Sequence, residues 1–168
     1  NPSFPPPAPI LPDSGQGTRL MWIPSLSAFR AGTSGGCCDW NRSNIGAYSF
    51  ASGLNTHASG FGSTAMGEAT QATHYHTTAF GYYSVANNFY AMAAGTHTTA
   101  SGKASIALGE GTIAKAYGST AIGAYNDDFL YFPDANFHAA GNRIFEIGNG
   151  YNGKPSNALT VYRTARTV

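Results

Sequence analysis

Small residues recur at every seventh position between residues 49 and 123. Alanine fills one position of each repeat from Ala51 to Ala121, and serine or threonine stands two residues earlier in every repeat except the one where Ala91 takes that place. Glycine stands two residues after the alanine in every second repeat, from Gly53 to Gly123, whereas the intervening repeats vary at that position. The true period is therefore fourteen residues.

This repeat predicts short strands separated by turns. Glycine at such density disfavours a helix, and alanine is the only aliphatic residue that recurs regularly, so the heptads do not indicate a coiled coil. Glycine, asparagine and histidine, which tolerate positive φ better than most residues, separate the short runs. We therefore expect an all-β solenoid in which each coil uses fourteen residues.

Alternation within each strand assigns the faces of the two expected sheets. Successive side chains of a strand point to opposite faces, so the alanine and hydroxyl positions share one face and the residues flanking alanine share the other. The small set must face inward, which predicts a narrow roll with two closely spaced sheets. After the alanine, one sheet carries polar residues such as Ser59 and Lys115, and the other carries mainly apolar ones.

The apolar outer positions predict contact between copies of the chain. Successive coils are about 4.8 Å apart, so the apolar outer residues of five coils form a stripe on the order of 25 Å long. A monomer rarely leaves such a patch exposed, so we expect self-association that buries the stripe on an axis parallel to the roll. The expected interface residues are Phe50, Met66, Phe80, Met92, Ile106, Leu108 and Ile122.

The repeat units resemble a known family. Gly-Ser-Thr-Ala-Met-Gly at 62–67 and Gly-Ser-Thr-Ala-Ile-Gly at 118–123, alternating with Thr-His-Ala-Ser-Gly at 56–60 and Thr-Thr-Ala-Ser-Gly at 98–102, look like the head repeats of YadA-like trimeric autotransporter adhesins. The resemblance covers about 75 of the 168 residues. It implies a left-handed parallel β-roll, and it implies that three chains pack side by side as a homotrimer.

The remaining sequence divides into three further regions around a roll expected at 45–125. Residues 1–18 are rich in proline and read as an extended linker. Residues 19–44 contain Trp22 and Trp40 among other large apolar residues and are expected to cap the open end of the solenoid, with a sugar-binding platform as the alternative. Residues 126–168 contain two alternating runs, 143–147 and 158–162, which predict a β-hairpin. Their segments 145–150 and 156–161 look like part of bacterial and phage fibre proteins.

Composition excludes several functional classes. Charged residues make up 10% of the chain, with 9 Lys and Arg against 8 Asp and Glu, so no basic field indicates nucleic acid. No apolar run reaches the length of a membrane span and no signal peptide opens the sequence, so we expect a mature product or an excised segment, without membrane insertion. The adjacent Cys37 and Cys38 are expected to be free or to cross-link chains, because neighbouring cysteines bridge each other only with strain.

No catalytic, metal or cofactor site is predicted. The histidines of the roll do not share one fourteen-residue column, so we expect no metal, although a threefold axis could bring one histidine from each chain together. Glu68 and Glu110 share a column but lie three coils apart, beyond the carboxylate spacing of glycosidases. We therefore expect a non-enzymatic protein without cofactors.

Aromatic residues at the turns are the remaining binding candidates. One column holds Phe61, Tyr75, Phe89 and Tyr117, with Lys103 as its exception. The pattern allows a ladder that staples coils and chains, or an exposed groove for a surface glycan or matrix protein. Tyr82, Tyr83 and Tyr90 are expected in adjacent turn positions. The expected ligand rim is Tyr75, Tyr82, Tyr83, Phe89, Tyr90 and Tyr117.

Three functions follow as hypotheses. The first is a trimeric extracellular fibre or adhesin head that mediates surface attachment through repeated weak contacts. The second is a receptor-binding fibre of a phage or contractile injection system. The third is a solenoid that binds ice or a crystalline surface through the threonine column containing Thr56, Thr70, Thr98 and Thr112, although that column shares the inward face with alanine.

Overall fold

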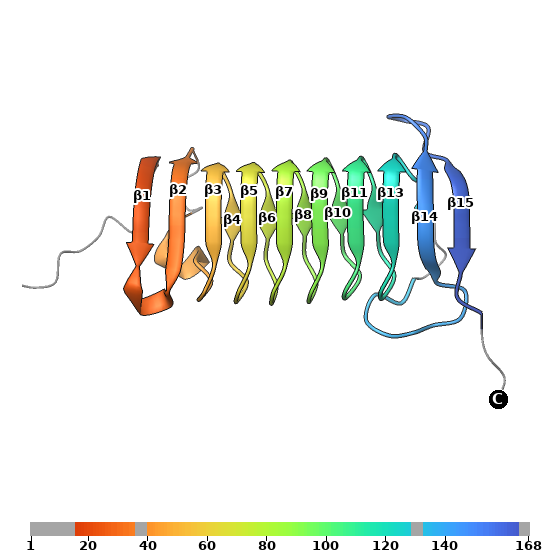
Figure 1. The fold of residues 1–168 in the computed structure, drawn as a ribbon, viewed down its shortest axis with the longest axis horizontal. Helices are drawn as coiled ribbons and strands as arrows, with labels where there is room; N and C mark the ends of the chain where they lie inside the picture. The colour runs from red at the N-terminus through yellow and green to blue at the C-terminus, as the bar shows by residue number, and fades with distance from the viewer. Residues whose placement is uncertain (1–15, 36–39, 129–132, 165–168) are drawn as a thin grey trace, which may run out of the picture.

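A computed structural model describes residues 16–35, 40–128 and 133–164. Its central part is a β-solenoid of about five turns with fourteen-residue coils (Figure 1). The long strands nearer the viewer in Figure 1 run upward, and the chain returns behind them through short strands while it advances toward the C-terminus. This sense is left-handed. The predicted all-β roll is therefore confirmed.

Each coil contributes one long and one short strand. The long strands of the coils are β3 (Phe50–Leu54), β5 (Thr64–Glu68), β7 (Thr78–Tyr82), β9 (Met92–Thr96), β11 (Ile106–Glu110) and β13 (Thr120–Ala124). The short strands are β4 (His57–Ala58), β6 (Gln71–Ala72), β8 (Val85–Ala86), β10 (Thr99–Ala100) and β12 (Ile113–Ala114). Long strands pair in parallel with long strands and short with short, always fourteen residues apart, as in the pairing of Ala93 with Ala107.

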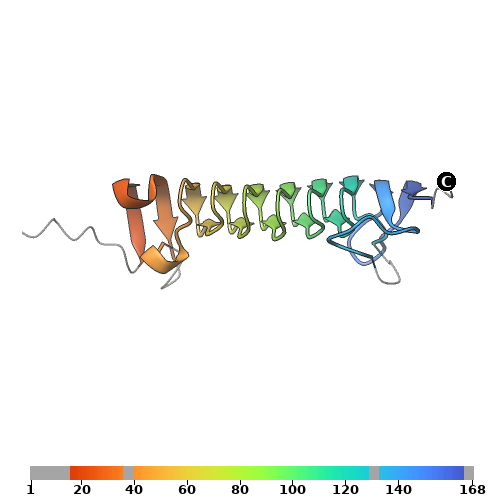
Figure 2. The same ribbon diagram turned by 90° about the horizontal axis from the view of Figure 1, so that it is seen from below.

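A hairpin extends the long sheet at each end of the solenoid. β1 (Gly17–Ile23) and β2 (Ala28–Ser34), joined by the 3-10 turn Pro24–Leu26, precede β3. β14 (Arg143–Asn149) and β15 (Asn157–Tyr162) follow β13, which confirms the expected C-terminal hairpin. β2 pairs with β3 and β14 pairs with β13, both in parallel, so the long sheet has ten strands (Figure 2). The second 3-10 turn, Arg42–Asn44, lies between β2 and β3.

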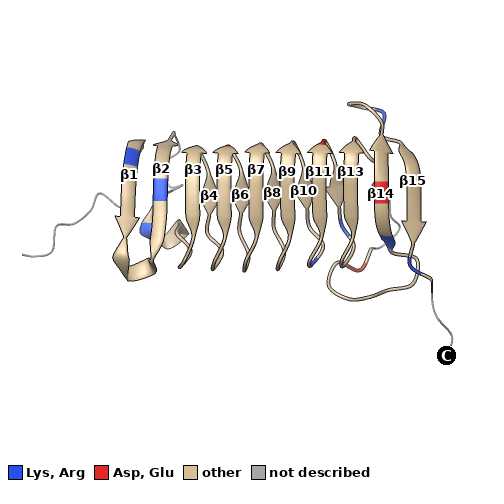
Figure 3. Cartoon of the chain, in the orientation of Figure 1, with Lys and Arg blue, Asp and Glu red and all other residues tan. Residues whose placement is uncertain are grey.

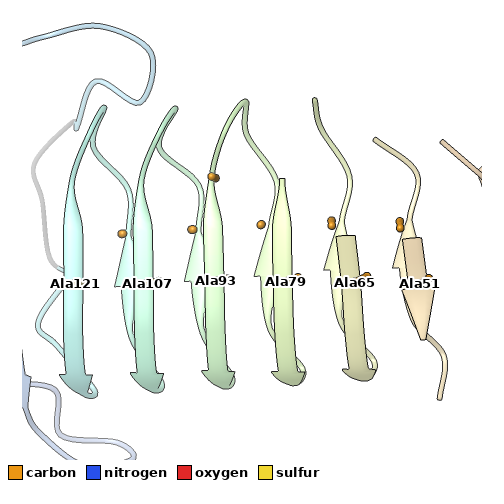
Figure 4. Packing of buried hydrophobic residues seen from close by; sticks show 12 residues of the cluster. Ala51, Ala65, Ala79, Ala93, Ala107 and Ala121 are labelled. Atoms are coloured by element: carbon orange, nitrogen blue, oxygen red, sulfur yellow. The ribbon is translucent and has the colours of Figure 1, made fainter. Parts of the chain in front are cut away.

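Alanine forms the core of the roll. Ala51, Ala65, Ala79, Ala93, Ala107 and Ala121 line up beneath the long sheet, and each is at most 1% exposed (Figure 4). The alanines of the short sheet face them, from Ala58 to Ala114. The serine and threonine positions are buried with them, as the shared face predicts. Side chains this small allow the two sheets to lie close together.

Glycine is required where the long strands end. At Gly95 the backbone has φ of +136°, and a Cβ atom would lie 1.9 Å from the carbonyl oxygen of Gly109 on the next coil. The same approach recurs along the column from Gly53 to Gly123. Both the positive φ and the close backbone contact exclude other residues, which explains why this position is glycine in every long strand of the coils.

Polar side chains cover the N-terminal end of the solenoid. Arg30 of β2 takes the inward position next to Ala51 and is 1% exposed. Its guanidinium donates to the carbonyl oxygens of Ser49 (3.2 Å) and Ala58 (2.8 Å) and to Ser49 Oγ (2.8 Å). Burial lowers the pKa of Arg30 to about 10, so the group stays charged at neutral pH. Trp40, also 1% exposed, donates its indole N–H to the carbonyl oxygen of Thr56 at 2.9 Å.

The C-terminal end is covered in a matching way. Asn126 lies beside the last short strand, and its side-chain amide exchanges two hydrogen bonds with the backbone of Ile113, at 2.7 and 3.0 Å. It also donates to Glu146 Oε2 at 2.9 Å. Glu146 takes the inward position next to Ala121. Side chains thus satisfy backbone groups that would otherwise face an open end.

The two tryptophans of the N-terminal segment have different environments. Trp40 is buried, so it cannot act as a sugar platform, whereas Trp22 is 55% exposed on β1. The proline-rich segment up to residue 15 and the two cysteines lie outside the described residues. Within the described parts of the chain, no helix is both long and apolar enough to cross a membrane.

Candidate functional site

The outer face of the long sheet carries two continuous rows of side chains. The strand registers place one outward residue before the inward position and one after it on every strand. The first row comprises Trp22, Phe29, Phe50, Thr64, Thr78, Met92, Ile106, Thr120, Phe145 and Val161. The second row comprises Leu20, Ala31, Ser52, Met66, Phe80, Ala94, Leu108, Ile122, Ile147 and Leu159. The rows contain no charged residue, and the charged positions that Figure 3 colours on β1, β2 and β14 belong to other columns of the sheet.

All seven expected interface residues lie in these two rows. Phe50, Met92 and Ile106 belong to the first row and the other four to the second. Met66 is 39% exposed and the others are half-buried, because each side chain packs against those of neighbouring strands. Phe29 and Phe50 stack with ring centroids 5.3 Å apart. The rows continue beyond the five coils of the expected stripe into both end hairpins.

The expected rim residues lie on two different edges of the roll. Successive turns of the chain alternate between the start and the end of the long strands, which are the lower and upper edges in Figure 1. Tyr75, Phe89 and Tyr90 lie on the lower edge, whereas Tyr82 and Tyr83 lie on the upper edge. The expectation that Tyr82, Tyr83 and Tyr90 occupy adjacent turn positions was therefore wrong, because consecutive turns are separated by the length of a strand.

The lower edge carries an exposed aromatic ladder. Phe61 contacts Tyr48 edge-on with ring centroids 5.0 Å apart and stacks on Tyr75 at 5.7 Å, and Tyr75 stacks on Phe89 at 5.6 Å. Tyr48 precedes the coils and lies outside the expected rim. All four side chains are between 39% and 63% exposed. One ring per coil therefore joins successive coils while leaving an aromatic surface open.

A second, shorter row of rings runs beside this ladder. His76 and Tyr90 are nearly parallel, with centroids 6.0 Å apart, and His76 also meets Phe61 edge-on at 5.6 Å. Both residues have positive φ, 54° and 62°. The left-handed backbone at this turn turns their side chains outward, and both are exposed. His76 is thus an exposed residue of the lower edge that lies outside the expected rim.

A loop closes the ladder toward the C-terminus. The backbone N–H groups of Lys103 and Tyr117 donate to the carbonyl oxygens of Ala135 and Asp134 at 2.7 and 2.9 Å. His138 lies against Tyr117 at 4.3 Å between ring centroids. Tyr117 is consequently half-covered and does not join the exposed rings.

The upper edge has a smaller cluster. His97 stacks on Tyr83 and meets Tyr82 edge-on, both at 5.4 Å between centroids. Two coils further on, Tyr125 donates to Glu110 Oε1 at 3.0 Å, and this hydrogen bond raises the pKa of Tyr125. Glu68 and Glu110 share a register column with Tyr82 and Thr96 between them, so they are three coils apart, as expected.

The described residues contain no group of three or more His, Cys, Asp or Glu that could hold a metal ion. His74 lies in a lower-edge turn, where its carbonyl accepts the Thr77 hydroxyl at 2.8 Å. His57 lies on the short sheet and His97 on the upper edge.

The threonine column is unavailable to an ice surface. Thr56, Thr70, Thr98 and Thr112 are each 0% exposed, because their side chains share the interior with alanine. Thr98 donates to Ser84 Oγ at 2.9 Å, inside the roll. The hypothesis of ice binding through this column is excluded.

Comparison with known proteins identifies the repeats. The family model described as "YadA head domain repeat (2 copies)" matches residues 58–84, 86–112 and 100–126. No curated protein and no solved structure matches the chain. The matched segment covers the coils from β4 to β13, and the fold found there is the β-roll that the resemblance implied. Residues 58–84 and 86–126 are therefore similar to YadA head repeats.

Proposed function

We propose that this chain is a non-enzymatic head module of an extracellular fibre, in which three copies stand side by side and attach to a surface. The apolar outer face of the long sheet is the observation that carries this proposal. It consists of two uncharged rows on ten strands, and no other segment of the described chain covers it. Water-exposed faces of this kind are usually interaction sites.

The similarity of the repeats to trimeric adhesins and this uncovered face both support a homotrimer. The seven interface residues from Phe50 to Ile122 would then face the axis between copies. The proposal predicts a trimer mass for the whole chain in light scattering on a sizing column. Replacement of Phe80 and Leu108 by serine should release monomers that keep the native far-UV circular dichroism. A wild-type protein that stays monomeric at every concentration would contradict it.

The lower edge is the proposed attachment surface. It presents the three stacked rings of Phe61, Tyr75 and Phe89, with Tyr48 edge-on to the first, and the second row of His76 and Tyr90. Asn88 and Asn136 beside them supply amide groups. Aromatic rings next to amides suit a neutral glycan or an extended protein segment. Three copies would present three such edges, so weak individual contacts would add to a measurable avidity.

A pair of matched variants tests the attachment surface. Tyr75→Ser with Tyr90→Ser changes the lower edge, and Tyr82→Ser with Tyr83→Ser changes the upper edge. On a glycan array and on immobilised matrix proteins, the lower-edge variant should lose binding and the upper-edge variant should keep it. Equal binding by both variants and the wild type would remove the aromatic ladder from recognition.

A further inference from the structure

We infer that both end hairpins belong to the same contact face as the coils, and that copies of this chain meet there at equal height, with a large side chain of one copy beside a small one of the next. This inference rests on the proposed function, because it specifies how the side-by-side copies meet. It assigns β1, β2, β14 and β15 to the interface.

Side-chain size within the two rows carries the argument. On six of the ten strands, one outward residue is large and the other is small. These pairs are Phe29 with Ala31, Phe50 with Ser52, Thr64 with Met66, Thr78 with Phe80, Met92 with Ala94, and Thr120 with Ile122. The large member lies in the first row on β2, β3 and β9, and in the second row on β5, β7 and β13.

Rotational symmetry about an axis parallel to the roll brings equal strands together. In such a ring, the first row of one copy lies beside the second row of the next, so each Phe80 meets a Thr78 and each Met92 meets an Ala94. Large side chains then fill the space left by small ones at these six heights. If one copy instead ran in the opposite direction along the roll, each strand would lie opposite the strand at the same distance from the other end of the sheet. β5 would then lie opposite β11, and Met66 would meet Ile106 or Leu108.

The end hairpins present the most exposed part of this face. Leu20 and Trp22 of β1 are 76% and 55% exposed, and Leu159 and Val161 of β15 are 45% and 39% exposed. Arg30 and Glu146 on the adjoining strands face inward, so neither hairpin places a charge among the outward rows. Both hairpins therefore continue the face without an electrostatic break.

The end hairpins enlarge the area that can be buried between copies. Ten strands at about 4.8 Å spacing and about 17 Å of strand length give on the order of 700 Å² per copy. A standard specific interface uses about 800 Å² per partner, and a trimer divides the face of each copy between two neighbours. The coils alone would supply little more than half of the area, so the hairpins make a substantial contribution.

A residue swap on β9 tests the equal-height contact. Ala94→Met places Met beside Met between copies, and Met92→Ala places Ala beside Ala. Sedimentation measures the protein concentration at which half of the trimer has dissociated. Each single variant should raise this midpoint concentration at least about tenfold. The double variant Met92→Ala/Ala94→Met restores one large and one small residue, and its midpoint should return to within about threefold of the wild type.

Hairpin variants test the extension of the face. Trp22→Ser and Val161→Ser should each raise the same midpoint about tenfold or more. Tyr83→Ser on the upper edge is the matched control and should leave it unchanged. Circular dichroism of diluted, monomeric samples shows whether each variant retains its β-structure, and a second substitution at the same height, Leu20→Ser or Leu159→Ser, replaces any variant that unfolds.

The outcomes separate this inference from the proposed function. A monomeric wild type overturns both. A trimeric wild type whose β9 double variant is as weak as the single variants overturns the equal-height contact alone. A trimer that tolerates all hairpin substitutions limits the interface to the coils.

Discussion

Arg30 and Glu146 lie on either side of six consecutive alanines in one inward-facing column of the long sheet. Arg30 pairs in register with Ala51, and Ala121 pairs with Glu146. Both charged residues are nearly buried, at 1% and 4% exposure. The Arg30 guanidinium donates to Ser49 Oγ and to the carbonyl oxygen of Ala58. Glu146 Oε2 accepts from Asn126 and Asn157 at 2.9 and 3.0 Å. Residues of opposite charge therefore lie next to the first and the last alanine of the column.

Removing the donors of Arg30 should destabilise the N-terminal end of the roll. Arg30→Met keeps much of the apolar stem but leaves Ser49 and Ala58 without the charged donors. We expect a loss of about 2 kcal/mol in the free energy of unfolding. Urea titration at one fixed protein concentration measures it, since oligomer stability depends on concentration. An unchanged midpoint would show that the cap does not contribute to stability.

Neutralising Glu146 tests the other end. Glu146→Gln keeps the size of the side chain and an oxygen that can replace Oε2, the acceptor of all three donors, but it removes the negative charge beside Arg143. We expect a loss of about 2 kcal/mol, because the hydrogen bonds to a neutral amide are weaker than those to the carboxylate and the buried Arg143 loses an opposite charge. The same titration measures the effect. A stability equal to that of the wild type would argue against a charged cap at this end.

The glycine column should reject even one extra carbon. Gly95→Ala would bring Cβ within 1.9 Å of the Gly109 carbonyl oxygen at a φ of +136°, so we expect a loss of about 3 kcal/mol or more. Gly118 is the matched control, because nothing lies within 4 Å of a Cβ there, although φ is +63°. Gly118→Ala should cost about 1 kcal/mol. Thermal unfolding of both variants distinguishes crowding from backbone strain, and equal losses would contradict the close approach.

Removing a buried hydroxyl should lower the free energy of unfolding only where that hydroxyl is hydrogen-bonded. Thr98 Oγ1 donates to Ser84 Oγ at 2.9 Å, whereas Thr70 Oγ1 is buried without a hydrogen-bond partner among the described residues. Thr98→Val should therefore cost about 1 kcal/mol, and Thr70→Val should be neutral or stabilising. Chemical denaturation of the pair is the measurement. The reverse order of stability would show that the hydroxyl of Thr70 has a role in the roll.

Whole coils should be removable. Deletion of residues 78–91 joins Thr77 to Met92 and preserves the inward and outward positions of every remaining strand. Deletion of the seven residues 78–84 instead places a short-strand sequence where a long strand is needed. We expect native far-UV circular dichroism and cooperative melting for the first protein only. Cooperative folding of both would mean that seven residues are the structural unit.

The sequence by itself determined the interior of the roll and the direction of its outer residues. Side chains alternate between the two faces of a strand, and the same residue types return every fourteen residues. Together these two regularities place small residues such as Ala93 and Thr98 on the inward face of their strands. The requirement for glycine at Gly95 and the column that stacks Tyr75 on Phe89 follow from the same period.

The tertiary structure decided what happens where the repeat ends. Arg30 and Glu146 lie outside the periodic stretch, and only strand pairing across long sequence distances places them in the alanine column. The division of the aromatic residues between two edges, the loop over Tyr117 and the continuation of the outward rows into the hairpins have the same origin. Periodicity describes contacts between equivalent coils, whereas the ends depend on segments that have no equivalent in the chain.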